Sequence, residues 1–454
     1  MSGTIVDNKE SKGGSGKSTI VFCPADNAIF PRAMIHFYFH NPDETPDFMN
    51  FAVLKESFYK TLCTSMPLAL ATDMRQTSTK HGGLTATLSS IPDYPLVTKH
   101  VDNEHTVEKM IAKKFSLCSQ PPAIVNVPSF ANPLAGDPLV TLDIVYMCDG
   151  VGFALALSHA IADMPALITV VQEWSQMAKS MFNSNQQVYQ SEKLDFDREW
   201  FWKSACAFPP GTFVDFDRHM DEVAAIAPGN DSVESEACHP HTSVYRLSIS
   251  PKSVETLRST RPDGCKDISV AALITAILWQ SHSLANPKSQ YTYLGSSITI
   301  RSTPEFARFC GNTATMDYLY YESAQLNAMP IADISKAIQA RNQSFSVGDF
   351  VRCVENYSEC AYMERYSNVT DSKHAAKIIV INISRLPSYN VDFGYGAPVK
   401  FVYPAKSTPP GFCIILPHNK LGGMDIYANL TSSVIENIAS AEFLNGHVEI
   451  MKYQ

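Results

Sequence analysis

Apolar and polar positions follow two spacings along the chain, and each spacing predicts one type of element. Short apolar runs bounded by turn residues predict strands over 18–23, 33–40, 139–148, 151–158, 243–249, 378–383 and 412–416. Apolar residues three or four positions apart predict helices over 51–65, 165–181, 251–258, 268–283 and 432–446. A tight Asp149-Gly150 turn between two of the strands is typical of a hairpin. Strands and helices mix in both halves without strict alternation, which predicts a mixed α/β (α+β) fold.

Interruptions of this pattern predict the domain organisation. Residues 1–18 are polar and rich in Gly and Ser, which indicates a disordered tail. Residues 191–242 are mostly polar and broken by prolines, and we interpret them as a crossover linker. The segments on either side, 19–190 and 243–454, are each long enough to form a domain with its own core, since domains usually have roughly 100–200 residues.

The overall composition restricts the class of protein. With 45% apolar and 18% charged residues, the chain is typical of a globular protein and not of a disordered one. A formal net charge of −9 argues against nucleic acid or an anionic membrane as the main partner, because both attract a basic face. We find no apolar run long enough to span a bilayer and no secretory signal. Eleven cysteines without a CxxC pair are typical of reduced, mostly buried thiols, so we expect a cytoplasmic protein.

Two local motifs resemble ligand sites but lack the context that such sites need. Residues 12–18 resemble a phosphate-binding loop, which requires a buried strand before it and a helix after it. Charged residues precede this segment and a strand-like run follows it, so a flexible tail is the favoured interpretation. Residues 238–241 read Cys-His-Pro-His, but zinc sites usually draw four ligands from two spaced pairs, and no second pair lies at a plausible spacing. We therefore expect an extended loop there and no metal.

The most informative pair is His159 and Asp163, between the predicted 151–158 strand and the next helix. With thirteen histidines in the chain, one aspartate four positions after a histidine is close to what chance produces. The surrounding sequence therefore decides between a functional and a structural interpretation. Pro165 suits the first turn of a helix and Asp163 suits the cap before it, so a structural role alone explains Asp163. His159 follows a hydrophobic strand, where a neutral imidazole can take a proton from a hydroxyl or amine. A hydrogen-bonded core histidine is the competing interpretation of His159.

A second motif, Asp392-Phe-Gly-Tyr-Gly396, gives the first motif a family context. In this order and about 230 residues apart, His159-Ala-Ile-Ala-Asp163 and the second motif resemble the HxxxD and DFGWG motifs of the BAHD acyltransferases. Further segments that resemble the family are Phe22–Asp26, Leu54-Lys55, Pro67–Ala69, Ile300-Arg301, Gly311-Asn312 and Arg385–Pro387. The resemblance therefore covers nearly the whole chain.

Several positions depart from the family pattern. Met164 stands where a glycine usually follows the motif aspartate, as in the fungal trichothecene 3-O-acetyltransferase-like branch, which the chain resembles most in its motifs. Tyr395 replaces the tryptophan of DFGWG, and Leu70 follows Pro-Leu-Ala in place of the usual Gly-Arg. Asn382 and Ile383 stand where many plant members carry Ser-Trp, in a stretch thought to help stabilise the oxyanion. Asn382 carries a hydrogen-bond donor and Ile383 does not.

The resemblance implies a fold and a pair of substrates. The expected fold is chloramphenicol-acetyltransferase-like, with two similar-sized domains, each a mixed β-sheet flanked by helices, and a channel through their interface. A segment near 370–395 is expected to pack with the N-terminal domain. Acyl-CoA, with acetyl-CoA the expected donor, enters the channel from one face and the acceptor from the other.

The resemblance also implies a role for each motif residue. His159 is the expected general base that deprotonates the acceptor. Asp163 points away from the cleft in this family and pairs with an arginine, for which Arg301 is the matching candidate. Asn382 is a possible oxyanion donor. The second motif is expected to be structural, through Asp392, Gly394 and Gly396.

The sequence thus predicts a CoA-dependent acyltransferase that modifies a hydroxyl or amine of a small specialised metabolite. We expect a monomer that needs no metal and binds neither nucleic acid nor membrane. One alternative is a cyclase or isomerase of the same fold that uses His159 without CoA. Another is a binding or scaffolding protein with a relict site, although His159 and Asp163 are both retained. An acyltransferase should bind CoA and depend on His159, whereas a cyclase should ignore CoA.

Overall fold

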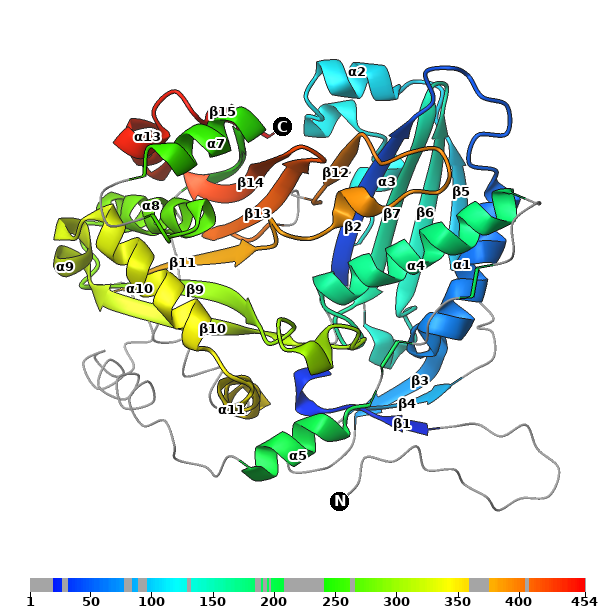
Figure 1. Cartoon of the computed structure of the whole chain (residues 1–454), viewed down its shortest axis with the longest axis horizontal. Helices are drawn as coiled ribbons and strands as arrows, with labels where there is room; N and C mark the ends of the chain where they lie inside the picture. Colours follow the sequence, from blue (N-terminus) through cyan, green and yellow to red (C-terminus); the bar gives the residue numbers. More distant parts are fainter. Residues whose placement is uncertain are drawn as a thin grey trace.

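Two large β-sheets meet in the computed structural model of the chain, with most helices on their outer faces (Figure 1). The structure describes residues 19–26, 32–76, 84–88, 96–128, 132–183, 189–190, 194–195, 197–207, 241–261, 266–358, 375–404 and 408–453. The predicted tail 1–18 and most of the predicted linker 191–242 lie outside the described residues. Both rejected ligand motifs fall there too, apart from His241.

The N-terminal half builds a five-stranded sheet around the predicted hairpin. Its order is β12 (Lys400–Val402), β2 (Arg32–His40), β7 (Gly150–Ser158), β6 (Val140–Met147) and β5 (Val97–Val101). The turn lies at Cys148 and Asp149, one residue earlier than predicted, because Gly150 already pairs with Met147. Gly150 is not part of the turn. A glycine is needed there for close packing of β7 on β2, since a Cβ would lie 2.2 Å from the carbonyl oxygen of Phe39.

Helices α1 (Phe51–Ser65) and α4 (Met164–Phe182) pack together against this sheet (Figure 1). The indole N–H of Trp174 in α4 donates to the carbonyl of Leu54 at 3.1 Å and to the hydroxyl of Ser57 at 3.0 Å. The aromatic rings around this indole are those of Phe58, Phe153 and Phe393. This buried cluster holds α4, and with it the segment that precedes α4, in a fixed position on the sheet.

The C-terminal half builds a seven-stranded sheet. Its order is β10 (Ala314–Glu322), β9 (Tyr291–Thr299), β11 (Ala375–Asn382), β13 (Phe412–Asn419), β14 (Gly422–Thr431), β8 (Thr242–Ile249) and β15 (Glu449–Lys452). The helices that cover it are α7 (Pro251–Ser259), α8 (Val270–Ala285), α9 (Ser323–Ala328), α10 (Ile331–Ser344) and α13 (Ser432–Ser440). The predicted last helix therefore ends at Ser440 and not at 446, because Ala441 is extended before a 3-10 turn over Glu442–Leu444. The edge strand β15, which follows, is not predicted by the sequence pattern.

Strand β13 of this sheet is buried on both faces. In β13, Cys413 and Ile415 belong to the core beneath the helices, whereas Ile414 and Leu416 join the core of the five-stranded sheet. A strand covered on both faces is apolar at every position, which explains the unbroken run over 412–416. The two sheets therefore share a continuous core at their junction.

One segment of the C-terminal half crosses to the five-stranded sheet. Strand β11 stays in the seven-stranded sheet, whereas Leu386 and Tyr389, within the expected 370–395, pack against the core of the five-stranded sheet. Beyond β11, Val391 and Phe393 are buried in the core of the five-stranded sheet, and β12 pairs with β2. Lys400 of β12 forms an ion pair with Asp425 of β14, which ties the segment back to the seven-stranded sheet. The crossing segment is therefore 386–403.

Smaller elements surround the junction of the sheets. A three-stranded sheet has the order β1 (Thr19–Val21), β4 (Leu84–Leu88) and β3 (Ala71–Gln76). A 3-10 helix, η1 (Pro24–Asp26), follows β1, and helix α11 (Val347–Ser358) packs against η1 and against helix α5 (Glu199–Ala207) (Figure 1). These elements pack around a group of buried rings, namely Phe201, Phe306, Phe309 and Phe350. The short helices α2 (Val107–Ala112) and α3 (Pro122–Val125) contact the five-stranded sheet through β2, β6 and β7.

Two expectations from composition can be checked on the described residues. Among them, no helix combines the length and apolar character that crossing a membrane requires. The six cysteines whose side chains the structure describes are free thiols. Three of these thiols, those of Cys63, Cys118 and Cys148, are exposed, so the described cysteines are less generally buried than expected.

Candidate active site

His159 lies directly after β7, beside the 302–313 loop of the C-terminal half. The backbone N–H of Ser158 donates to the carbonyl of Leu139 at 2.8 Å, and that of Ile161 donates to the carbonyl of Ser158 at 3.0 Å. The chain therefore turns sharply at His159. Residues 160–162 are fully buried, whereas the imidazole is half-buried. This geometry leaves the ring as the side chain of the turn that can reach a reacting molecule.

Asp163 caps the helix that follows and is only 2% exposed. Its Oδ1 accepts a hydrogen bond from Ala166 N at 2.9 Å and another from a guanidinium nitrogen of Arg301 at 2.8 Å. Its Oδ2 accepts from the backbone N–H of Thr313 at 3.0 Å and from the Thr313 hydroxyl at 2.9 Å. The carboxylate is thus occupied by four donors. It holds the turn and is not available to react with a substrate.

Arg301 lies just beyond β9 and joins the two halves of the protein. Besides Asp163, it donates to the carbonyls of Phe309 at 2.6 Å, Gly311 at 3.2 Å and Phe306 at 3.3 Å. The 302–313 loop of the C-terminal half is thereby wrapped around the guanidinium. The ion pair expected from the sequence is present, with side chains 12% and 2% exposed.

Asn312 is the described residue that contacts the imidazole side chain by hydrogen bonding. Its Oδ1 lies 3.4 Å from Nδ1 of His159, and its Nδ2 donates to the backbone carbonyl of His159. Nδ2 also donates to Oδ1 of Asp26 at 3.2 Å. Asp26 in turn accepts from Nε of Arg198 at 2.6 Å. The imidazole is therefore one end of a chain of buried polar side chains.

Burial sets the protonation of His159. Removal from water disfavours the imidazolium and lowers the pKa of His159 below its usual 6.5. The hydrogen bond to Asn312 and the nearby charge of Asp163 raise this pKa, but by less than burial lowers it. The ring is accordingly neutral near pH 7, which is the form that can accept a proton.

Asn382 ends β11, and that strand points towards the five-stranded sheet (Figure 1). Its Oδ1 accepts from the backbone N–H of Ser384 at 3.2 Å and from the Ser384 hydroxyl at 2.8 Å. Both contacts engage the oxygen, so Nδ2 is the end of the amide that can donate to another group. Within the described part of the chain, no hydrogen bond joins Asn382 to His159.

The second motif lies at the opposite end of α4 from Asp163. Asp392 accepts from Lys179 Nζ at 2.6 Å and from the backbone N–H groups of Gly394 and Gly396 at 2.8 and 2.9 Å. These three donors hold the pKa of Asp392 below its usual range, although burial acts in the other direction. Lys179 lies roughly 24 Å along the helix from Asp163, at about 1.5 Å per residue.

The backbone of the motif explains its glycines. Gly394 and Gly396 have φ angles of +100° and +92°, in the region that side chains rarely adopt. The ring between the aspartate and the first glycine, Phe393, enters the aromatic cluster around Trp174. The motif therefore anchors the crossing segment to α4 and makes no hydrogen bond with His159.

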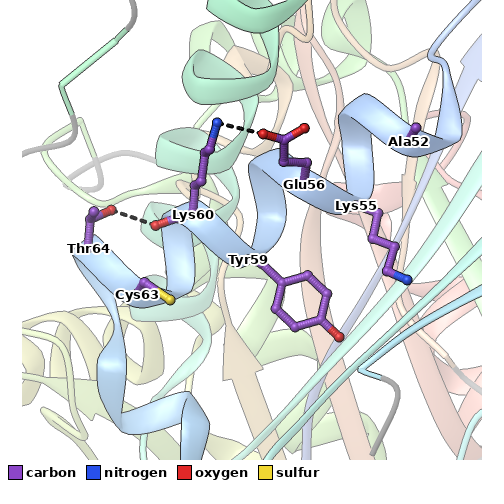
Figure 2. Close-up of a pocket in the computed structure, with 7 residues that line it drawn as sticks. All are labelled: Ala52, Lys55, Glu56, Tyr59, Lys60, Cys63 and Thr64. Atoms are coloured by element: carbon purple, nitrogen blue, oxygen red, sulfur yellow. Dashed lines mark hydrogen bonds and ion pairs between the residues drawn. The ribbon is translucent and has the colours of Figure 1, made fainter. Parts of the chain in front are cut away.

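A separate hollow of about 490 Å³ lies along the outer side of α1 (Figure 2). Its lining consists of Ala52, Lys55, Glu56, Tyr59, Lys60, Cys63 and Thr64. Lys60 and Glu56 form an ion pair at 2.7 Å along the helix surface. None of the residues that surround His159 lines this hollow, so it is distinct from the candidate active site.

Sequence reasoning missed part of this site. The sequence motifs predict no role for Asp26, Arg198 or Asn312, although Phe22–Asp26 and Gly311-Asn312 resemble segments of the family. A buried carboxylate, guanidinium and amide that meet from three separate segments become visible only in the fold. Among the described residues, no group of three or more His, Cys, Asp or Glu side chains is placed to hold a metal ion.

Comparison with known proteins gives this geometry a context. A family model described as the Transferase family matches residues 106–443, which include the turn at His159 and the 302–313 loop. The chain is also 23% identical over 326 residues to a hydroxycinnamoyl-CoA:5-hydroxyanthranilate N-hydroxycinnamoyltransferase of Avena sativa, covering 68% of each chain.

Solved structures share the fold along nearly the whole chain. TRI101 of F. graminearum, in complex with coenzyme A and T-2 mycotoxin, superposes with a TM-score of 0.69 at 13% identity, over 95% of this chain and 99% of that one. Vinorine synthase superposes with a TM-score of 0.60 at 15% identity, over 93% of this chain and 92% of that one. At these identities the likeness establishes the fold alone, a mixed α/β architecture of two similar units.

Proposed function

The chain belongs to the Transferase family of acyl-CoA-dependent acyltransferases, and from that premise we propose that it acylates a hydroxyl or amine of a small molecule, with His159 as the general base. The observation that carries the proposal is the position of His159. It is a neutral, half-buried imidazole on a turn that Asp163 and Arg301 fix between the two halves of the protein. The bound coenzyme A and T-2 mycotoxin in TRI101 support acyl-CoA as donor and a small organic molecule as acceptor.

The proposed reaction is a direct transfer. His159 takes the proton of the acceptor hydroxyl while the oxygen attacks the thioester carbonyl and forms a tetrahedral oxyanion. The intermediate then expels the thiolate of CoA, and the imidazolium returns its proton to that sulfur. The products are the ester and free CoA-SH, and the imidazole is neutral again. An amine acceptor follows the same course and gives an amide.

The oxyanion needs a hydrogen-bond donor, and we assign Asn382 to this role. A single donor of this kind is commonly worth about 2.7–4 kcal/mol of barrier. Ser384 holds the oxygen of the Asn382 amide, which leaves Nδ2 to donate. Acetyl-CoA is the donor to test first, since the motifs resemble those of the 3-O-acetyltransferase branch.

The pH dependence of turnover follows from the lowered pKa of His159. The base must be neutral to act, so kcat/KM is expected to rise with pH below 6.5 and to be level from about pH 6.5 to 8. The measurement is release of CoA thiol across pH 5–9 at low acceptor concentration. An acid limb centred above pH 7 would contradict this assignment.

Binding of the donor can be tested without knowing the acceptor. We expect CoA and acetyl-CoA to raise the thermal unfolding midpoint by a few degrees, because a ligand at a hundred times its Kd adds about 2.7 kcal/mol of stability. His159→Ala should show the same shift, since it removes a base and not the CoA site. If neither CoA nor acetyl-CoA raised the unfolding midpoint, the result would favour a cyclase or isomerase that uses His159 without CoA.

The proposal itself is tested with acetyl-CoA and a panel of hydroxylated and amino compounds. Acyl transfer predicts thiol release that requires both substrates and a product heavier by the acyl group. Thiol release without any acceptor dependence would indicate thioester hydrolysis and would overturn the proposed transfer.

A further inference from the structure

A chain of three buried side chains leads from Arg198 to the imidazole of His159. Nε of Arg198 donates to Oδ2 of Asp26 at 2.6 Å, and Oδ1 of Asp26 accepts from Nδ2 of Asn312 at 3.2 Å. Oδ1 of Asn312 lies 3.4 Å from Nδ1 of His159. Asp26 is 1% exposed, and Arg198 and Asn312 are each 5% exposed. Four separate segments thus contribute one residue each.

The surroundings of Arg198 keep water away from its ion pair with Asp26. The guanidinium lies over the rings of Phe22 and Phe309, at 5.4 and 5.7 Å from their centroids. A guanidinium is always protonated in proteins, and its charge keeps a carboxylate beside it ionised. Asp26 can therefore only accept hydrogen bonds.

Because Asp26 can only accept, it also fixes the orientation of the Asn312 amide. The end of the Asn312 amide that faces Oδ1 of Asp26 also faces the backbone carbonyl of His159, and both groups only accept. That end must be the NH₂, because the amide oxygen would meet two oxygens there. The amide oxygen consequently faces Nδ1 of His159. An oxygen that only accepts requires a proton on Nδ1, and Nε2 is then the nitrogen with a free lone pair.

We infer that the Arg198–Asp26 pair is a positioning device that fixes the Asn312 amide and so makes Nε2 the basic nitrogen of His159. The inference rests on the proposed function of His159 as general base. Neither Asp26 nor Arg198 touches the imidazole, so each acts through Asn312.

Among the described residues, the other charged or titratable groups that act on these side chains are Asp163, Arg301, Cys23 and Cys310. Asp163 and Arg301 are engaged with each other on the other side of the turn. The thiol of Cys23 donates to Asp26 at 3.4 Å, and burial raises the pKa values of Cys23 and Cys310, so both thiols are neutral. Arg198 and Asp26 are therefore the ionised pair that bears on the Asn312 amide.

Asp26→Asn is the sharpest test, because Arg198 dictates how the new amide lies. Its oxygen must accept from Arg198, which turns its NH₂ towards the NH₂ of Asn312. Two donors face each other, and rotation of Asn312 relieves this at the expense of its hydrogen bond to the His159 carbonyl. The rotation turns the NH₂ of Asn312 towards Nδ1 of His159. The proton of the neutral ring then moves to Nε2, where it blocks the base.

The primary readout is the ¹⁵N spectrum of the His159 ring, assigned with His159→Ala. We expect wild type to carry its proton on Nδ1 and Asp26→Asn to carry it increasingly on Nε2. This readout does not need turnover, so it tests the inference even if the proposed function fails. An unchanged ring spectrum in a folded Asp26→Asn variant would overturn the inference, and absence of acyl transfer in wild type would overturn only the proposed function.

Kinetics give the second readout. Asp26→Asn is expected to lower kcat about tenfold, the effect of losing one hydrogen bond to a charged group, with KM for acyl-CoA unchanged. The exchange variant D26N/N312D restores a donor at 26 and an acceptor at 312 that faces Nδ1. It should recover kcat, with the acid limb of the pH profile moved upward by the new carboxylate. A loss of stability alone cannot explain both a recovered kcat and an acid limb moved to higher pH.

Asp425→Asn serves as the matched control. Asp425 is also 1% exposed and ion-paired, with Lys400, but it lies near the opposite end of β2 from His159. Lys400 pairs with Tyr38 of β2, whereas Ser158, the residue before His159, pairs with Arg32. These two positions of β2 are six residues apart, which is roughly 20 Å at about 3.3 Å per residue. The control should lose stability without changing the His159 spectrum. A control that changed the spectrum as strongly as Asp26→Asn would show a non-specific effect and overturn the inference.

Discussion

Replacing His159 by alanine is expected to lower kcat by roughly 10²–10⁴-fold, the usual contribution of a general base. The acceptor hydroxyl would then have to attack with its proton in place or pass it to water. Asp163 cannot substitute, because four donors occupy its carboxylate. The half-buried ring makes its one described side-chain hydrogen bond to Asn312, so the variant should remain folded.

The measurement is the initial rate of CoA release at saturating acyl-CoA and acceptor, with the thermal midpoint measured alongside. His100→Ala is a suitable control, because His100 also makes a side-chain hydrogen bond, to the carboxylate of Asp143 at 2.8 Å, but lies on the edge strand β5. Its rate should match wild type. If a folded His159→Ala protein kept a tenth or more of the wild-type rate, His159 would not be the base.

Local sequence signals predicted elements well where one periodic face decides the structure. The predicted and observed bounds of α1 agree at Phe51–Ser65, because an amphipathic repeat follows a capping Asn50 whose side chain accepts from Ala52 N. The last helix was predicted too long because its apolar spacing continues through a 3-10 turn over Glu442–Leu444. The apolar pattern does not predict the edge strand β15, because this strand is four residues long and carries a charged residue at each end.

The crossing segment shows where local signals end. Nothing in the periodicity of 386–403 says which sheet it joins, and the expectation that a segment near 370–395 packs with the N-terminal domain came from the family resemblance alone. Its destination is decided by Phe393 packing on Trp174 and by β12 pairing with β2, contacts between residues more than 200 positions apart.

The residues of the candidate site also fall into two groups, those that the sequence can predict and those that only the fold brings together. His159 and Asp163 share one short motif, and Arg301 came with the family resemblance, so the sequence could name all three. Asp26 and Asn312 are 286 positions apart and meet only because the 302–313 loop folds around Arg301. Pairs of this kind leave no periodic pattern in a single sequence.

Removing Arg301 is expected to cause the largest loss of stability. Arg301→Met leaves the Asp163 carboxylate buried without its cation, and breaking a buried ion pair in this way typically costs about 3–5 kcal/mol. The 302–313 loop also loses the donor that binds three of its carbonyls. The thermal midpoint should therefore fall by several degrees, and turnover should fall with it because the turn at His159 loosens.

A double-mutant cycle separates the ion pair from the loop contacts. Asp163→Asn should also lose stability, because Asn is neutral while the guanidinium stays buried. Adding Asp163→Asn to Arg301→Met should then cost less than Asp163→Asn alone, since no unpaired charge remains. The fluorescence-detected unfolding midpoints of the four proteins measure this coupling. Strictly additive losses would mean that the two side chains act independently. An Asp163→Asn protein that melted like wild type yet lost all turnover would instead place Asp163 in the chemistry and not in the support of the turn.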